Sequence, residues 1–303
     1  MTLLAVGSVA LDTIETPIGR HEEILGGSCT FFSLAASHFS PVSIVAVVGT
    51  DFPEAHAELL RSKGVDTHGL EWAKGRTFRW SGRYSATLAE RTTLDTQLNV
   101  FAGFEPKLSA EHKKARLVFL GNIDPALQRG VLDQVEKPEL VAMDTMNFWI
   151  EGSNESLRRT LARVDVLVIN EEEIRQLSGE HNVVRAATAV RAMGPKAVVV
   201  KRGEYGAILF GMDQTFAVTA YPLSDVLDPT GAGDSFAGGL MGSLARERRL
   251  DAAAWRRAMV MGTVLGSFSV EGIGVERLRT LTTPEVEGRY HAYGRLTRVE
   301  GIE

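Results

Sequence analysis

Short apolar runs alternate along the chain with longer stretches in which apolar residues return at helical spacing. The runs are rich in aliphatic residues and continuous rather than alternating, which is typical of strands buried on both faces. The predicted buried strands are residues 3–7, 42–48, 117–120, 140–144, 164–169 and 197–200. Two further β-prone runs, 207–210 and 215–218, predict a hairpin at the edge of the same sheet.

Helices are predicted in most of the intervals between these strands. Their expected positions are residues 28–39, 52–63, a segment from 125, 153–163, 171–177, 183–193, 234–248 and 252–268, followed by a short terminal helix. Repeated strand–helix units favour the α/β class, with a mainly parallel central sheet and helices on both faces.

Two segments depart from this alternation. Residues 13–25 and 76–104 mix β-branched, aromatic and polar positions, and the pattern predicts strands near 77–84 and 92–101 that alternate only in part. We interpret the two segments as a small β-sheet lid on a single domain spanning residues 1–303.

Composition narrows the function class. The hydrophobic fraction of 44% is ordinary, and the formal charge of −5 gives no support for nucleic acid or an anionic membrane as partner. No apolar run approaches the roughly 20 residues of a membrane span, and the first residues lack the basic character of a signal peptide. Cys29 is the only cysteine, so an intrachain disulfide is impossible and we expect a cytoplasmic protein. Cys29 is either a buried small residue or a nucleophile.

The most informative stretch is residues 227–239, Leu-Asp-Pro-Thr-Gly-Ala-Gly-Asp-Ser-Phe-Ala-Gly-Gly. It predicts a turn that opens a helix, with backbone N–H groups from Gly231, Ala232 and Gly233 directed outward. Such a helix start attracts anions, because its first amides lack partners and the helix dipole adds positive potential. An aspartate next to an anion site is electrostatically unfavourable, and the position of Asp234 is explained if it accepts a proton from the group that attacks the anion. The alternative is an Asp-capped helix with a glycine-rich start.

This stretch closely resembles the signature of the ribokinase-like carbohydrate kinase family, also called the PfkB family. Further landmarks of the family recur in the expected order across essentially the whole chain. They are Gly7-Ser8 with Asp12, Gly26-Gly27, Asn170-Glu171-Glu172-Glu173, Lys201-Arg202-Gly203-Glu204-Tyr205-Gly206, and Ser269 to Gly274. No Gly-x-x-x-x-Gly-Lys-Ser/Thr string occurs, so a P-loop does not explain the pattern.

The resemblance implies ATP-dependent phosphorylation of an alcohol, which we expect to be a CH₂OH of a sugar or nucleoside. Asp234 is then the base, and the amides of Gly231, Ala232 and Gly233 form the anion hole. The acceptor-side residues that we assign are Asp12, Gly26, Gly27, Phe31 and Asn99. The nucleotide-side residues are Asn170, Lys201, Gly203, Gly206, Gly233 and Thr263. Glu173 is assigned to Mg²⁺ through water, and a K⁺ site is expected at Asp228, Thr230, Ser269, Gly272 and Gly274.

Each landmark also has a simpler interpretation. Asp12 fits a turn after a strand, Asn170 to Glu173 fit an acidic first helical turn, and Gly203 with Gly206 fit a hairpin. The sequence departs from the family at Phe31, where the family commonly carries a substrate-binding Asn.

Aromatic residues of the predicted lid leave three uses open. Trp80, Phe101 and Phe104, with Arg83 and Asn99 nearby, could contact the acceptor, pack within the lid or join two lids in a homodimer. The role of residues 144–149 is open as well. A non-catalytic sugar- or nucleotide-binding regulatory protein of the same fold is the alternative function.

Overall fold

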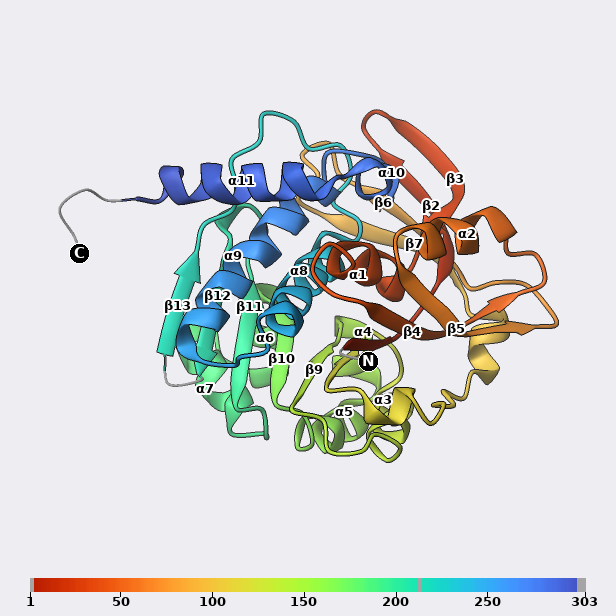
Figure 1. The fold of residues 1–303 in the computed structure, drawn as a ribbon, viewed down its shortest axis with the longest axis horizontal. Helices are drawn as coiled ribbons and strands as arrows, with labels where there is room; N and C mark the ends of the chain where they lie inside the picture. The colour runs from red at the N-terminus through yellow and green to blue at the C-terminus, as the bar shows by residue number, and fades with distance from the viewer. Residues whose placement is uncertain (1–2, 212–213, 299–303) are drawn as a thin grey trace.

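The computed structural model describes residues 3–211 and 214–298, so the ends of the predicted domain, 1–2 and 299–303, lie outside it. Within the described residues a nine-stranded sheet has the order β13-β12-β11-β10-β9-β8-β1-β4-β5 (Figure 1). Its strands are β1 (Leu3–Val6), β4 (Val42–Gly49), β5 (Val65–Ala73), β8 (Leu117–Leu120), β9 (Leu140–Asp144), β10 (Val166–Asn170), β11 (Ala197–Lys201), β12 (Ala207–Gly211) and β13 (Gln214–Val218). All pairs from β5 to β11 are parallel, and β12 and β13 add the expected antiparallel hairpin at one edge.

Helices cover both faces of this sheet, as the alternating pattern predicts. Alternate residues of β1 divide between two cores, with Leu3 in one and Leu4 in the other. The first core is covered by α1 (Ser28–Ala36), α2 (Glu54–Ser62), α8 (Ala232–Glu247), α9 (Ala252–Ser269), α10 (Glu276–Thr280) and α11 (Thr283–Leu296). The second is covered by α3 (Pro125–Leu132), α4 (Asn147–Gly152), α5 (Asn154–Leu161), α6 (Glu171–Ser178) and α7 (Val183–Arg191).

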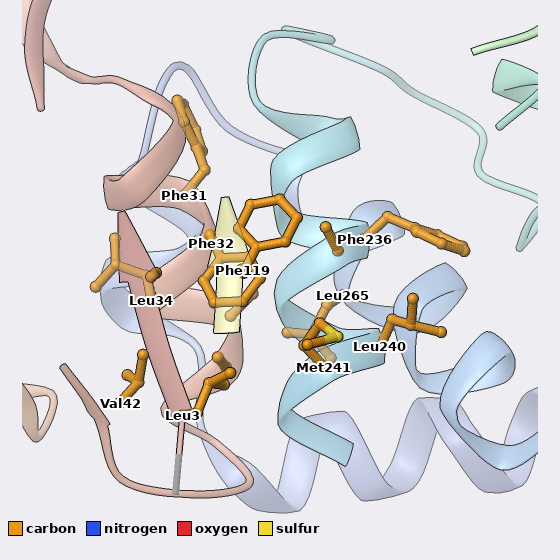
Figure 2. Packing of buried hydrophobic residues seen from close by; sticks show 14 of the residues in the cluster. Leu3, Phe31, Phe32, Leu34, Val42, Phe119, Phe236, Leu240, Met241 and Leu265 are labelled. Atoms are coloured by element: carbon orange, nitrogen blue, oxygen red, sulfur yellow. The ribbon is translucent and has the colours of Figure 1, made fainter. Parts of the chain in front are cut away.

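Close packing of α1 and α9 against α8 fixes the position of the α8 start. A Cβ on Gly238 would lie 2.3 Å from the Phe32 carbonyl oxygen in α1, and one on Gly239 would lie 2.6 Å from the Met261 carbonyl oxygen in α9. Beneath this contact Phe32 stacks on Phe119 of β8 with ring centroids 4.2 Å apart (Figure 2). Gly238 and Gly239, which belong to the glycine-rich stretch 227–239, therefore allow α1 and α9 to pack closely against α8.

A second, four-stranded sheet has the order β3-β2-β6-β7 and lies beside α10 in Figure 1. It consists of β2 (Ala10–Thr16), β3 (Gly19–Gly26), β6 (Arg79–Tyr84) and β7 (Arg91–Gln97). The β2–β3 and β6–β7 pairs are antiparallel, whereas β2 and β6 run parallel. The predicted small sheet is confirmed, and its role as a lid stays a prediction.

Three local expectations differ from the structure. Strand β5 was not expected, because it is the edge of the large sheet and its sequence is largely polar and partly exposed. The predicted strand at 92–101 ends at Gln97 and is followed by a 3₁₀ turn over Asn99–Gly103. The short terminal helix is in fact a pair, α10 and the 14-residue α11, which begins with a capping box at Thr282 and Glu285.

Candidate active site

Polar side chains gather where parallel strands of the large sheet end. Asp144 ends β9, Asn170 ends β10 and Lys201 ends β11, and Asn170 and Lys201 are register partners. Carboxyl ends of parallel strands share one edge of the sheet, where open α/β folds bind ligands. The start of α8 faces the same group, because a Cβ on Gly233 would lie 2.8 Å from Nζ of Lys201.

The turn before α8 is held by a buried carboxylate. Asp228 is fully buried, and its two oxygens accept hydrogen bonds from the backbone N–H groups of Thr230 at 2.9 Å and Gly274 at 2.8 Å. Gly231 then adopts a left-handed conformation, with φ of 74°, and α8 begins at Ala232. Asp228 thus connects the turn before α8, residues 228–231, to the segment after α9.

Backbone donors remain free at this helix start. The Ala232 N–H donates to the Pro229 carbonyl at 3.2 Å, and the Ser235 N–H donates to the Gly231 carbonyl at 2.8 Å. By contrast, the N–H groups of Gly231 and Gly233 have no hydrogen-bond acceptor on another residue between 3 and 298, apart from the undescribed 212–213. Of the three predicted anion-hole amides, two are therefore available and the Ala232 amide is engaged in the turn.

One ammonium lies among three carboxylates in this site. Nζ of Lys201 donates to Oδ2 of Asp144 at 3.1 Å, and Asp144 is almost fully buried. Burial alone would lower the pKa of Lys201, but the charges of Asp144, Glu173 and Asp234 outweigh burial and raise it. Lys201 is therefore a permanent positive charge beside the α8 start.

The two carboxylates next to this cation are unusually basic. Burial, followed by the negative charge of Asp144, raises the pKa of Asp234 to about 7. The same two causes in the same order raise the pKa of Glu173 to about 7. Lys201 and Arg91 of β7 oppose both shifts. An aspartate that titrates near neutrality has the proton affinity that a general base needs.

Asp12 of β2 is a further buried acid whose charge environment includes the α8 start. It is 4% exposed, and its carboxyl occupies the space beside Gly26, where a Cβ would lie 1.9 Å from Oδ2. Burial, then the charges of Asp228 and Asp234, raise the pKa of Asp12 to about 8. The predicted di-glycine motif therefore makes room for the acid that it accompanies.

The small sheet contacts the turn before α8 through a side-chain hydrogen bond. The hydroxyl of Tyr84 in β6 shares a 2.9 Å hydrogen bond with the hydroxyl of Thr230. Burial raises the pKa of Tyr84 to about 12, so this hydroxyl keeps its proton. On the other side of the turn, the ring of Phe31 lies against Gly231.

Several other residues predicted to bind ligands instead make contacts within the protein. Asn99 is exposed and its amide donates to the Thr77 carbonyl at 2.9 Å. Phe101 and Phe104 stack on each other and belong to the second core. The hydroxyl of Thr263, within α9, donates to the Met259 carbonyl at 3.2 Å.

The nucleotide-side motifs occupy strand ends. Asn170 and Glu173 form a capping box at the start of α6, with hydrogen bonds of 2.8 and 3.1 Å. Gly203 and Gly206 flank a short exposed turn after β11 and both have positive φ. The first motif is thus locally an acidic first helical turn, and the second is locally a turn. Ligand binding by either motif stays a prediction. At the expected K⁺ site, Ser269 has a buried hydroxyl without a partner among the described residues.

Sequence reasoning left Asp144 without a role and did not single out Tyr84 or Arg91. The available signal for Asp144 was an acid at the end of a buried run, at the edge where open α/β sheets bind ligands. No sequence pattern marked Tyr84 or Arg91, because only the strand pairing of the small sheet brings them near the start of α8.

Comparison with known proteins agrees with this geometry. Residues 22–278 match the family described as "pfkB family carbohydrate kinase". The chain belongs to this family. Among its relatives, this PfkB kinase is 28% identical to a cytidine kinase of Thermococcus kodakarensis, over 83% of the chain and 91% of the relative. It is 26% identical to a nucleoside kinase of Methanothermobacter thermautotrophicus, over 90% of the chain and 91% of the relative.

Solved structures share the fold of this PfkB kinase. The nucleoside kinase of Methanocaldococcus jannaschii superimposes with a TM-score of 0.77 and 18% identity, covering 96% of this chain and 99% of the other. A putative ribokinase II of E. coli, in complex with ATP and Mg²⁺, superimposes with a TM-score of 0.76 and 21% identity, covering 96% and 99%. Membership and these relatives make the protein a carbohydrate or nucleoside kinase.

The residues present fit ATP and Mg²⁺, which the family uses. Free amides at a helix start suit phosphate oxygens, and Glu173 supplies a hard oxygen donor. Within residues 3–211 and 214–298 no group of three or more His, Cys, Asp or Glu is arranged to hold a metal. Mg²⁺ commonly keeps several waters and binds through one or two carboxylates together with substrate phosphates, so such a cage is not required.

The described part of the chain contains no helix that is both long and apolar enough to cross a membrane.

Proposed function

We propose that this PfkB kinase transfers the γ-phosphoryl group of ATP to a CH₂OH of a nucleoside. The observation that carries the proposal is the position of Asp234 next to the free amide of Gly233, with a pKa raised to about 7. The nucleoside is favoured over a sugar because two relatives that cover most of the chain are a cytidine kinase and a nucleoside kinase.

The acceptor hydroxyl is oriented from the Asp12 side. A ribose hydroxyl that hydrogen-bonds to the Asp12 carboxyl group is held beside Gly26 and Gly27. The charge of Asp234 contributes to the raised pKa of Asp12, which supports placing both residues at one site. Positioning of this kind supplies a large part of the barrier reduction in phosphoryl transfer.

In the chemical step Asp234 accepts the proton of the CH₂OH while the hydroxyl oxygen attacks the γ-phosphorus of ATP. The bond from the γ-phosphorus to the bridging oxygen breaks, and ADP leaves with that oxygen. The free amides of Gly231 and Gly233 donate to the phosphoryl oxygens, and Lys201 lies beside them as a buried cation. Glu173 would hold Mg²⁺ through water, and the bound ion would supply charge neutralisation at the phosphates. Asn170, Gly203, Gly206 and Thr263 are proposed for the nucleotide side.

Replacement of the base tests the proposal. We expect Asp234→Asn to lower kcat by roughly 10²- to 10⁴-fold with ATP binding retained. The exposed neighbour Asp225 provides the control, since Asp225→Asn removes a carboxylate outside the site and should leave kcat unchanged. An unchanged kcat in Asp234→Asn excludes it as the base. If the wild-type chain binds nucleosides but phosphorylates neither nucleosides nor sugars, the regulatory-protein alternative is correct.

A monovalent-cation site and a lid-mediated dimer complete the proposal. The buried Ser269 hydroxyl near the Asp228 turn supports the K⁺ site, together with Gly272 and Gly274. Turnover that is identical with and without K⁺ in sodium-free buffer excludes this site. The edge strand β7 is exposed along its length, which suits pairing with a second copy. A monomer by light scattering at micromolar concentration contradicts the dimer.

A further inference from the structure

One face of the small sheet is directed at the turn before α8. Tyr84 on this face bonds to Thr230, and the side chain of Ile24 lies within 2.9 Å of the position a Cβ on Gly274 would take. Asp12 is the register partner of Ile24, so its side chain is on the same face. We call this the inner face.

Trp80 lies next to Asp12 on the inner face. The two residues are register partners in the parallel β2–β6 pair, and neighbouring strands are about 4.8 Å apart. Gly82 and Tyr84 follow Trp80 at alternate positions of β6 and therefore share its face. A ligand hydroxyl bound by Asp12 is consequently one strand spacing from Trp80.

The indole of Trp80 is held in one orientation. A Cβ on Gly82 would lie 2.0 Å from a carbon of its six-membered ring, so the ring occupies the space that glycine leaves. Its Nε1 donates to the Thr93 hydroxyl at 3.4 Å, and the ring remains partly exposed. A fixed, accessible aromatic ring beside a substrate-binding carboxylate is a preorganised binding surface.

A planar group already fits on this ring. The guanidinium carbon of Arg91, the register partner of Tyr84, lies 5.4 Å from the ring centroid. Such a pair at a partly exposed position is weak, and Arg91 is itself exposed, so another planar group can displace it.

We propose that Trp80 is the specificity-determining contact for the planar base of the acceptor. The base stacks on the indole face that Arg91 covers here, while Asp12 holds the ribose, and Gly82 is required because any side chain there displaces the ring. This inference rests on the proposed nucleoside kinase function and adds the residue that separates nucleosides from simple sugars.

Kinetics of the full-length chain test the inference, with ATP and a panel of cytidine, uridine, adenosine, inosine and ribose. For the best nucleoside we expect Trp80→Ala to raise KM roughly 10- to 100-fold, because a base–aromatic stack is lost. Trp80→Phe should keep KM within about threefold, since it retains an aromatic face. KM for ATP should not change in either variant. Trp72→Ala, which removes an exposed tryptophan of β5, is the matched control and should leave the nucleoside KM unchanged.

The outcomes separate the inference from the proposed function. An unchanged nucleoside KM in Trp80→Ala, or an equal rise of KM for ATP, overturns the role of Trp80 while phosphorylation of nucleosides stands. A wild-type chain that phosphorylates ribose but no nucleoside contradicts the proposed acceptor, and the inference falls with it. Should Trp80→Ala fail to fold in a thermal scan, Trp80→Leu retains bulk without a π-face and carries the same expectation.

Discussion

The ring of Phe31 lies directly against the backbone of Gly231. A Cβ on Gly231 would be 2.3 to 2.4 Å from three ring carbons of Phe31, and Phe31 itself is 1% exposed within α1. Phe31, which the sequence suggested as an acceptor contact, thus packs against the turn before α8. Helix α1 and the turn before α8 are therefore packed against each other as one unit.

Substitution of this glycine should damage both stability and catalysis. In Gly231→Ala the new Cβ meets the Phe31 ring, and alanine disfavours the φ of 74° by about 1–2 kcal/mol. We expect a lower melting temperature and a fall in kcat on the order of 100-fold, as for a misplacement of about 1 Å. Gly288→Ala in α11 meets no atom within 4 Å and should instead stabilise the chain by up to about 1 kcal/mol. Normal kcat in Gly231→Ala contradicts the proposed role of the turn.

The pH dependence of turnover should report the charges around Asp234. Asp234 must be ionised to accept a proton, so kcat/KM should rise with pH through about 7. Asp144→Asn removes a negative charge that raises this pKa, and the midpoint should move to lower pH. Lys201→Met removes a positive charge that lowers it, and the midpoint should move to higher pH. Shifts in the same direction for both variants would show that Asp234 does not set the profile.

Stability should fall as pH rises, because the site holds carboxyl groups in the protonated form. Burial raises the pKa of Asp12 to about 8, whereas in the unfolded chain it titrates near its ordinary value. Between these values the folded protein binds more protons than the unfolded chain, so the free energy of unfolding decreases with pH and levels off above about 8. Asp12→Asn cannot ionise, so its advantage in stability over the wild type should be larger at pH 8 than at pH 5, on the order of a few kcal/mol.

Urea unfolding of wild type and Asp12→Asn at pH 5 and pH 8 measures this difference. The variant should also show a higher KM for the acceptor, because an amide replaces the proposed hydroxyl acceptor. If the difference in free energy of unfolding between the variant and the wild type is the same at both pH values, Asp12 does not titrate in this range.

The hydrogen bond between Tyr84 and Thr230 should contribute to closing the small sheet over the turn. Tyr84→Phe removes this bond, and a loss of about 0.5–1.5 kcal/mol corresponds to a two- to tenfold lower kcat/KM for the acceptor. Tyr290→Phe, which alters a partly exposed tyrosine of α11 outside the proposed site, serves as the matched control. Equal effects of the two substitutions would exclude a specific role for the Tyr84 hydroxyl.

Much of the fold could be predicted from local pattern. Continuous apolar runs predicted the strands of the large sheet that are buried on both faces, and helical spacing predicted α8 and α9 to within two residues at each end. Strand β5 was missed because an edge strand buries only part of its surface, so its sequence lacks the apolar run. The terminal helix pair was underestimated because the exposed surface of α11 obscures its few buried positions.

By itself the sequence determined the family, the α/β architecture and the glycine-rich helix start, because these depend on neighbouring residues and on turn chemistry that only a few residue types allow. Tertiary structure decided which distant residues meet there. Register between β10 and β11 aligns Lys201 with Asn170, sheet pairing carries Tyr84 to Thr230, and α1 brings Phe31 onto Gly231. The raised pKa of Asp234 likewise follows from burial and from Asp144, which is 90 residues away in the chain. Electrostatic and packing interactions depend on distance in space, which sequence separation does not give.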